Sequence, residues 1–410
     1  MAEREHAGPL KGCKVIELAH IMAGPVCGLM LADMGADVIK VEKPTGDDTR
    51  RSVPPSIEGE SAAFMMMNRN KRGIVLDLKT PSGAEALRKL VSQADVVIEN
   101  YRMGTLEKLG LGYEVFRQDN PGLIYASVSG FGRTGPYADR GGFDLIAQGY
   151  SGLMSITGEG PGRPPVKVGA PVSDITAGIL AAMGICAAYA HKLKTGEGQK
   201  VDTSLFEAGI VHTYWQSAIA FATGSPPGAM GSAHPLNAPY QAFPTRDGWI
   251  NIGAANQKNW DLLVDLIDAP ELAQEARFED NAARMENREA LQDVLSDHMA
   301  KRTTAEWLAL FEREGLPAGP VLDVMQMHAH EQTIARDMVT TVHHDTAGPV
   351  QTIGLPVKFS ATPGRLTKAA PRLGNDTVEV LRQAGYQAAE IDAMLKEGAA
   401  QTSGDPLPEG

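Results

Sequence analysis

Residues 13–128 alternate short apolar runs with segments of helical periodicity, and this alternation constrains the fold more than any other feature of the chain. The apolar runs have the length of buried strands and cover residues 13–18, 37–41, 73–78, 95–99 and 123–128. Helical patterns lie between them, through residues 29–32 and over residues 81–91, where a proline stands in the first turn. Strands that alternate with helices in this way form parallel sheets with helices on both faces. Ligands of such sheets bind at the loops beyond the carboxyl ends of the strands.

A change of composition marks the end of this first part. A helical pattern over residues 205–223 gives way to a Gly- and Pro-rich stretch, 224–235, which is incompatible with regular structure. A hairpin pattern over residues 240–253 and several helical segments follow. We therefore predict an α/β protein with a Rossmann-like, parallel-sheet large domain (1–224), a smaller α+β domain (225–328), a C-terminal segment (329–400) and a flexible tail (401–410).

The overall charge and the cysteines narrow the class of partner. A formal net charge of −12 disfavours general attraction to nucleic acid or to an anionic membrane, although a local basic patch can still bind a phosphorylated small molecule. The apolar stretch 175–190 falls short of a membrane span, and the polar N-terminal residues do not resemble a secretory signal. Cys13, Cys27 and Cys186 have no metal or redox spacing. We expect a cytoplasmic protein that acts on small molecules.

Asp174 is the only formally charged side chain between Lys167 and Lys192 when histidine is counted as neutral. It stands where an apolar helix begins, and Ser173 or Asp174 could therefore cap that helix by accepting backbone N–H bonds. The alternative is a nucleophile, since a carboxylate can attack an acyl group and form a mixed anhydride. The two interpretations are compatible, because a helix N-terminus both holds an anion and supplies donors to a developing oxyanion.

Basic residues gather near two of the predicted strands. Arg69, Lys71 and Arg72 precede one strand, and Arg102 and Lys108 follow the next. They form either a solvated rim of surface charge or a cradle for phosphate. The turn after the first strand, residues 20–28, lacks the G-x-G-x-x-G fingerprint, which disfavours a nicotinamide dinucleotide.

Asp144 is a second carboxylate in a glycine-rich, apolar setting, where the local sequence slightly favours another helix cap. No histidine has a metal-ligand partner four residues away or a cysteine pair nearby, so we predict no metal.

The order of these segments from residue 10 to about residue 395 resembles the class III CoA-transferases. The segments that carry the resemblance are 20–25, 36–42, 68–72, 99–101, 169–178 and 194–199. The resemblance implies that Asp174 is a nucleophile that forms acyl-anhydride and aspartyl-CoA intermediates in turn, supported by Asp144, Gln148, Gly142 and Gly169. It also implies that coenzyme A is bound by residues of the first domain: His20, Ala23, Lys43, Leu76, Lys79, Asn100, Arg102 and Lys108, beside the basic residues Arg69, Lys71 and Arg72.

The same resemblance implies a homodimer of two chains interlaced like linked rings, with the C-terminal segment returning to the large domain. Segments 231–235, 239–243 and 247–248 look most like the branch that uses dicarboxylic acids, with succinyl-CoA as a candidate donor. One alternative is the 2-methylacyl-CoA racemase branch, which has a histidine where this chain has Phe143; racemisation needs two bases, and phenylalanine cannot accept a proton. Another alternative is a CoA-binding protein without turnover.

Overall fold

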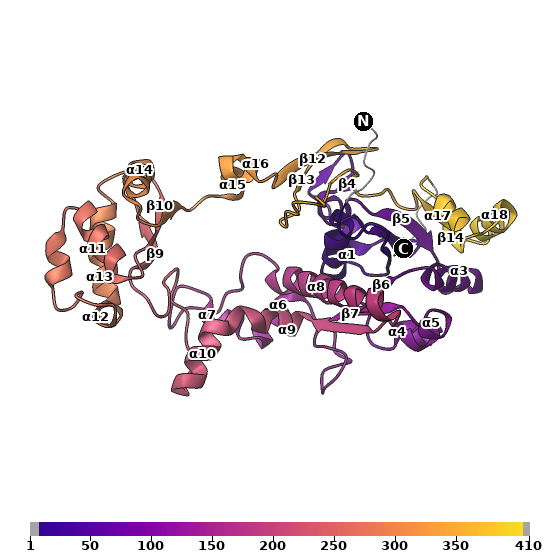
Figure 1. Ribbon diagram of the computed structural model, residues 1–410, viewed down its shortest axis with the longest axis horizontal. Helices are drawn as coiled ribbons and strands as arrows, with labels where there is room; N and C mark the ends of the chain where they lie inside the picture. The colour runs from indigo at the N-terminus through magenta and orange to yellow at the C-terminus, as the bar shows by residue number, and fades with distance from the viewer. Residues whose placement is uncertain (1–7, 405–410) are drawn as a thin grey trace. The chain divides into compact units, whose positions relative to one another are not determined.

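The computed structural model describes residues 8–404, which form two compact units (Figure 1). The first unit contains residues 8–153, 168–213 and 331–404, and the second contains 154–167 and 214–330. The predicted boundary at residue 224 therefore lies too late. The helix expected over 205–223 is broken into α9 (Leu205–Ile210), a 3₁₀ turn (Val211–Thr213) and α10 (Tyr214–Thr223). None of the residues of α10 is buried, so this helix adds nothing to the core of the first unit.

A seven-stranded sheet forms the centre of the first unit, in the order β14-β5-β2-β1-β6-β7-β8. All neighbouring strands are parallel except β14, which pairs antiparallel with β5, and the predicted parallel α/β sheet is thus confirmed. The strands are β1 (Lys14–Glu17), β2 (Asp37–Glu42), β5 (Arg72–Leu76), β6 (Val96–Glu99), β7 (Ile124–Ser129), β8 (Lys200–Ser204) and β14 (Ala400–Gln401). The chain runs outward from β1 in one direction through β2 and β5 and in the other through β6 and β7. The gap between the ends of β1 and β6 is therefore the point at which such sheets bind ligands.

Helices cover both faces of this sheet, each over its own apolar core. One face carries α1 (Ala23–Asp33), α8 (Val172–Thr195) and α9, and the other carries α3 (Pro81–Ser92), α5 (Tyr113–Asp119), α17 (Thr377–Gln383) and α18 (Ala388–Lys396). A Cβ on Gly178 would lie 2.6 Å from the carbonyl oxygen of Ala23, so glycine at this position allows α8 to cross close to α1. This crossing brings the first turn of α8 beside the start of α1.

Helix α8 is longer than the predicted stretch 175–190. By length and composition alone it could cross a membrane, with a mean hydropathy of 1.5, and it is the one helix in the described part of the chain that passes this test. It packs against α1, α9 and strands β7 and β8, which is the environment of a core helix. The predicted apolar stretch 175–190 is therefore shorter than the helix that contains it.

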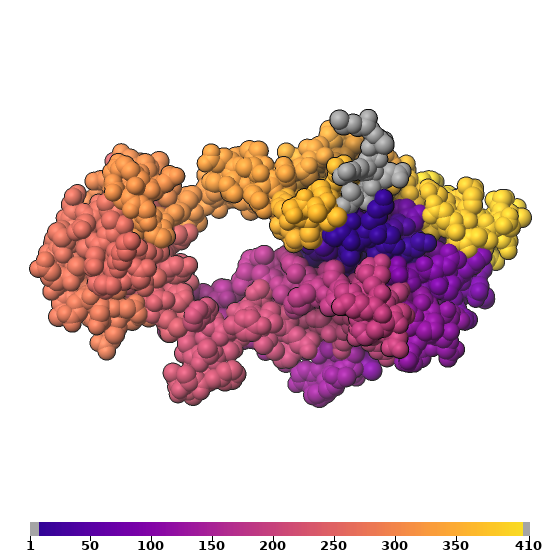
Figure 2. All heavy atoms as spheres, viewed as in Figure 1, coloured from indigo at the N-terminus to yellow at the C-terminus, as the bar shows by residue number. Residues whose placement is uncertain are grey.

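Shorter elements complete the first unit. They are β3 (Ser56–Ile57), β4 (Glu60–Ser61), α2 (Ala62–Asn68), α4 (Thr105–Lys108), α6 (Asp144–Tyr150), α16 (Glu331–Ala335), β12 (Val339–His344) and β13 (Gly348–Ile353). In Figure 2 the yellow C-terminal residues lie against the indigo and purple N-terminal residues, in agreement with the pairing of β14 with β5. Because Gln401 belongs to β14, the predicted tail begins too early, and its last residues, 405–410, lie outside the described residues.

The second unit has its own core around a three-stranded antiparallel sheet, β11-β10-β9. Strands β9 (Tyr240–Pro244) and β10 (Trp249–Gly253) form the predicted hairpin, and β11 (Ala318–Pro320) pairs with β10. Its remaining helices are α11 (Gln257–Leu266), α12 (Asn281–Glu286), α13 (Arg288–Met299), α14 (Thr304–Glu314) and α15 (Val324–Ala329); α7 (Leu153–Ile156) spans the boundary between the units.

Candidate functional site

The carboxylate of Asp174 lies in the first turn of α8, but it does not cap the helix. The helix begins at Val172, its N-cap residue is Pro171, and no side chain of its own caps it. The prediction that Ser173 or Asp174 acts as the cap is therefore wrong. Within residues 8–404 we find no hydrogen bond or ion pair to the Asp174 carboxylate, which leaves it available for chemistry.

Asp144 supplies the cap from a different helix. Its Oδ1 accepts hydrogen bonds from the backbone N–H of Ser173 at 2.9 Å and, at a longer 3.4 Å, from that of Asp174. Asp144 is the first residue of α6, so two helix starts meet at this carboxylate. The carboxylate of Asp144 thus accepts hydrogen bonds from N–H groups at the start of α8 that have no partner within the helix, and the side chain of Asp174 is not needed for this.

Gln148 holds Asp144 in this position. Its Nε2 donates to Oδ2 of Asp144 at 2.6 Å, and its Oε1 accepts from the backbone N–H of Val168 at 2.8 Å. Gln148 is completely buried, so its two hydrogen bonds fix which end of the amide faces Asp144. The structure thereby brings together three of the residues singled out from sequence: Asp174, Asp144 and Gln148.

The two supporting glycines differ in what the structure requires of them. A Cβ on Gly142 would lie 2.7 Å from Cα of Gly130, so glycine at 142 lets the loop before α6 approach the end of β7. A Cβ on Gly169 would meet nothing within 4 Å. The local space therefore explains the glycine at 142 and leaves the one at 169 without a steric reason.

The surroundings of Asp174 raise its pKa from 3.8 to about 7. Burial is the larger cause, because it disfavours the charged form, and the charge of Asp144 adds to it. A carboxylate with such a pKa is a stronger base and nucleophile than an exposed aspartate, and it is still substantially ionised near pH 7.

A pocket of about 320 Å³ opens in front of Asp174 at the carboxyl edge of the sheet. Its walls come from the turn after β1, from the segment after β6 and from the loop after β7. The predicted site residues that line it are His20, Ala23, Asn100, Arg102, Gly142 and Asp174. This is the position that the strand order marks for a ligand.

His20 and Asn100 join the two strand ends at the pocket. Oδ1 of Asn100 accepts from the backbone N–H of His20 at 2.9 Å, and Nδ2 of Asn100 donates to the carbonyl oxygen of His20 at 2.7 Å. Burial, the largest cause, lowers the pKa of the His20 imidazole, so the ring is neutral at pH 7. Two hydrogen bonds to one side chain hold this backbone unit in a single orientation.

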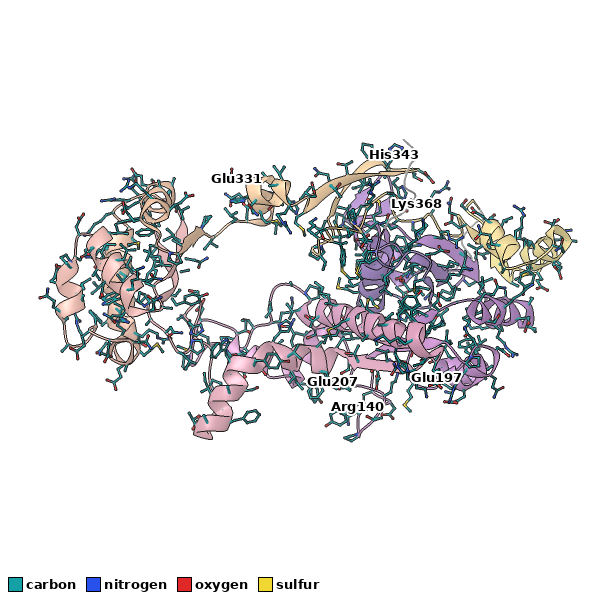
Figure 3. The ribbon with its side chains drawn as sticks, in the orientation of Figure 1. Arg140, Glu197, Glu207, Glu331, His343 and Lys368 are labelled. Carbon is teal, nitrogen blue, oxygen red and sulfur yellow. The ribbon has the colours of Figure 1, made fainter. Side chains whose placement is uncertain are left out.

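Sequence reasoning missed two further arginines that line the pocket, Arg133 and Arg140. Nη2 of Arg133 bonds both oxygens of the buried Glu99, at 2.6 and 2.8 Å. Arg140, labelled in Figure 3, lies on the loop between β7 and α6 with its guanidinium 3.8 Å from the centre of the Tyr137 ring. Their place after the carboxyl end of a predicted strand was the one signal that could have identified them.

The structure corrects the prediction that the basic residues before β5 face a phosphate. Arg69 is buried with Nη2 2.6 Å from Asp33, and Lys71 is buried with Nζ 2.8 Å from Glu17. A buried and paired cation has no free face for a phosphate group. Arg72 opens β5 at the amino edge of the sheet, opposite the pocket, and pairs with Asp37 at 2.6 Å.

The remaining predicted CoA contacts are scattered. Leu76 is 1% exposed and packs in the core, so its side chain is not available to a ligand. Lys43 lines a small cavity of about 70 Å³ with His20 and also pairs with Asp48 at 2.9 Å.

Lys79 and Lys108 are exposed and do not line the pocket in front of Asp174. Arg102 is the predicted cation that reaches the pocket, where its guanidinium lies beside Gly141.

In the described range, 8–404, no group of three or more His, Cys, Asp or Glu side chains is placed to hold a metal ion.

The chain is similar to known CoA-transferases along most of its length. The family model described as CoA-transferase family III matches residues 10–377. The succinate–glutarate CoA-transferase of Agrobacterium fabrum is 41% identical over 382 residues, which cover 92% of this chain and 95% of that protein. The human succinyl-CoA:glutarate CoA-transferase is 36% identical over 392 residues, covering 95% and 89%. A crystal structure of a CAIB/BAIF family protein from Brucella suis superposes with a TM-score of 0.84 at 40% identity and covers 92% of this chain and 100% of that one. The chain therefore belongs to CoA-transferase family III.

Proposed function

We propose that this protein transfers coenzyme A from an acyl-CoA, with succinyl-CoA as the donor, to a free dicarboxylic acid, and that Asp174 is the nucleophile. The observation that carries the proposal is the unpaired, half-buried carboxylate of Asp174 in the pocket, with its pKa raised to about 7. The similar proteins from Agrobacterium fabrum, a succinate–glutarate CoA-transferase, and from human, a succinyl-CoA:glutarate CoA-transferase, support a five- or four-carbon diacid as the acceptor and succinyl-CoA as the donor.

The reaction requires two exchanges of acyl partner at Asp174. A carboxylate oxygen of Asp174 attacks the thioester carbonyl, the C–S bond breaks, and an acyl-aspartyl anhydride and the CoA thiolate result. The thiolate then attacks the aspartyl carbonyl, which releases the donor acid and leaves an aspartyl-CoA thioester. The acceptor carboxylate then attacks the aspartyl-CoA carbonyl, which releases the CoA thiolate and forms a second anhydride. The thiolate attacks the acceptor's carbonyl in that anhydride, so the second acyl-CoA leaves and the carboxylate of Asp174 is restored. No net proton is consumed, and one difficult transfer is divided into easier steps.

Placement supplies most of the rate in such a scheme. Holding a carboxylate against a thioester carbonyl can contribute ~7–11 kcal/mol through effective molarity. The first backbone N–H groups of α1, at Ala23 and Gly24, have no acceptor within the helix because a helix leaves its first N–H groups unpaired. Ala23 lines the pocket, and its N–H is the donor we propose for the oxyanion, worth roughly 3–4 kcal/mol.

The pocket also suggests how CoA is held. We propose that His20, Ala23 and Asn100 contact the pantetheine arm that leads to Asp174 and that Arg102 binds a phosphate group. The exposed Lys43, Lys79 and Lys108 extend the positive charge beyond the pocket. Arg69, Lys71, Arg72 and the side chain of Leu76 have no part in this arrangement.

We propose a homodimer as the active form. On the first unit, helices α6 and α8 pack together and leave large apolar side chains exposed: Leu145 (50%), Ile146 (44%), Tyr150 (52%), Ile179 (47%) and Met183 (63%). An apolar surface of this kind marks an interaction site, and a second copy of the chain is the partner we infer. The three free cysteines support a reducing compartment, which we take to be the cytoplasm.

A library experiment tests the proposal. The purified protein is incubated with several acyl-CoA donors and a set of carboxylic acids, and new acyl-CoA species are identified by mass spectrometry. We expect succinyl-CoA with diacid acceptors to give the largest yield. If CoA is bound and nothing is transferred, the protein is a binding protein. Deuterium uptake at the 2-carbon of a 2-methylacyl-CoA would indicate the racemase. The site does not favour racemisation, because the exposed Phe143 cannot act as a base.

A further inference from the structure

We propose that Asp47, held by Lys40, is a positioning residue of the transferase site, and that it acts by fixing the turn between β1 and α1. This inference rests on the proposed function, because the turn forms the wall of the pocket that faces Asp174. Neither Asp47 nor Lys40 lines the pocket in front of Asp174. Their effect on the reaction therefore has to pass through the backbone of the turn.

Asp47 and Lys40 belong to a buried chain of alternating charges. Oδ2 of Asp47 lies 2.8 Å from Nζ of Lys40, which lies 3.1 Å from Oε1 of Glu17, and Oε2 of Glu17 lies 2.8 Å from Nζ of Lys71. All four side chains are at most 1% exposed, and the two cations balance the two anions. Burying four charges carries a large desolvation penalty, and apolar residues of similar size often give equal stability. Stability alone is therefore a weak reason for this chain of charges.

The same side chains hold the backbone of the turn. Nζ of Lys40 donates to the carbonyl oxygen of Ala19 at 2.8 Å, and Oδ1 of Asp47 accepts from the N–H of Ile21 at 3.1 Å. Between these two contacts, His20 is bound through both its N–H and its carbonyl oxygen by Asn100. Each residue from 19 to 21 thus has a backbone group bonded to a side chain from outside the turn.

The turn needs this support because Ile21 is strained. Its φ of 68° lies in the left-handed region, which a β-branched residue avoids. Such a conformation costs on the order of 1–3 kcal/mol and persists only where the surroundings determine it. Met22 follows directly as the N-cap of α1, so relaxation of Ile21 would reorient the first N–H groups of α1 at the pocket. A misplacement of about 1 Å in such a wall can lower a rate about a hundredfold.

Two double variants separate this role from the role of the charges. Lys40→Met/Asp47→Asn and Lys40→Met/Asp47→Leu each remove one positive and one negative charge and leave Glu17 paired with Lys71. Asparagine keeps an oxygen that can accept from the N–H of Ile21, whereas leucine does not. Both variants lose the hydrogen bond from Lys40 to Ala19, so the two are compared with each other, and we expect kcat of the leucine variant to lie at least tenfold below that of the asparagine variant, with both proteins folded by circular dichroism and melting temperature.

Hydrogen exchange supplies a readout that does not depend on turnover. Peptides that cover residues 18–26 should exchange faster in the leucine variant than in the asparagine variant. Peptides over residues 47–53 serve as the comparison, because Asp47 also accepts from the N–H of Thr49. Faster exchange confined to 47–53 would refute the proposal, as would equal kcat in the two folded variants.

Failure to fold is also an informative outcome. If the leucine variant does not fold, Lys40→Met/Asp47→Ala is used in its place. If the asparagine variant alone folds, Asp47 is needed for folding itself and the proposal fails. If the wild type transfers no CoA with any donor, the proposed function fails, and the exchange comparison still decides whether Asp47 fixes the turn.

Discussion

Replacing Asp174 with asparagine should make the protein more stable at high pH while abolishing transfer. The surroundings raise the pKa of Asp174 from 3.8, its value in an unfolded chain, to about 7 in the folded protein. Between these two values the folded state binds more protons than the unfolded state, so the free energy of unfolding falls as the pH rises. Asparagine has no charge to bury at any pH. It therefore escapes this penalty and keeps the shape of the side chain.

The magnitude follows from the two pKa values. A shift from 3.8 to about 7 corresponds to an upper limit of about 4 kcal/mol, because one pKa unit is worth about 1.4 kcal/mol. The difference in unfolding free energy between variant and wild type should widen by about 2–3 kcal/mol from pH 5 to pH 8, since the unfolded carboxylate is ionised over that interval while the folded one keeps its proton up to about pH 7.

Urea unfolding at the two pH values, at one protein concentration, measures this difference. Asp139→Asn, at an exposed carboxylate on the loop before α6, controls for the change in net charge. A gap between Asp174→Asn and the wild type that stays constant with pH, or a variant that is less stable at pH 8, would show that Asp174 is not a destabilised buried carboxylate.

Three further substitutions test other parts of the site. Asp144→Asn removes a charge that raises the pKa of Asp174, so the rising limb of kcat/KM against pH should move from about 7 to lower pH, and an unchanged midpoint would exclude the coupling. Arg102→Ala should weaken CoA binding in calorimetry by about 1.5–3 kcal/mol, the value of a hydrogen bond to a charged group, while Arg117→Ala on the surface of α5 should have no effect; equal affinities would remove Arg102 from the site. Arg69→Met breaks a buried ion pair and should lower the free energy of unfolding by about 3–5 kcal/mol, yet the folded protein should bind CoA normally, and a large loss of affinity would restore Arg69 to the CoA site.

The central strands could be predicted because their sequences are apolar over the whole length of a buried strand. The two edge strands could not. In β8, exposed and half-buried positions alternate, and β14 has two residues and follows the rest of the sheet by more than a hundred residues. Pairing to a neighbour, rather than a pattern in their own sequence, gives these edge strands their structure.

Asp174 could be identified because it is the one charge in an apolar stretch, whereas its surroundings could not. The cap on α8 comes from Asp144, thirty residues earlier in the chain, and only the packing of α6 on α8 brings the two together. Arg69 and Lys71 were misjudged for the same reason. Their partners, Asp33 and Glu17, lie far away in sequence, so a run of basic residues that are buried looks like a run on the surface.

The most direct test of the account is to trap the intermediate on Asp174. The wild type and Asp174→Asn are each incubated with an acyl-CoA and treated with hydroxylamine, which converts an anhydride or thioester into a stable hydroxamate, and the peptides are analysed by mass spectrometry. We expect the label on Asp174 in the wild type and no label in the variant, because an amide cannot form the anhydride. If a variant sample that is checked for deamidation keeps near-normal transfer, or if the label falls on another carboxylate such as Asp144, Asp174 is not the nucleophile.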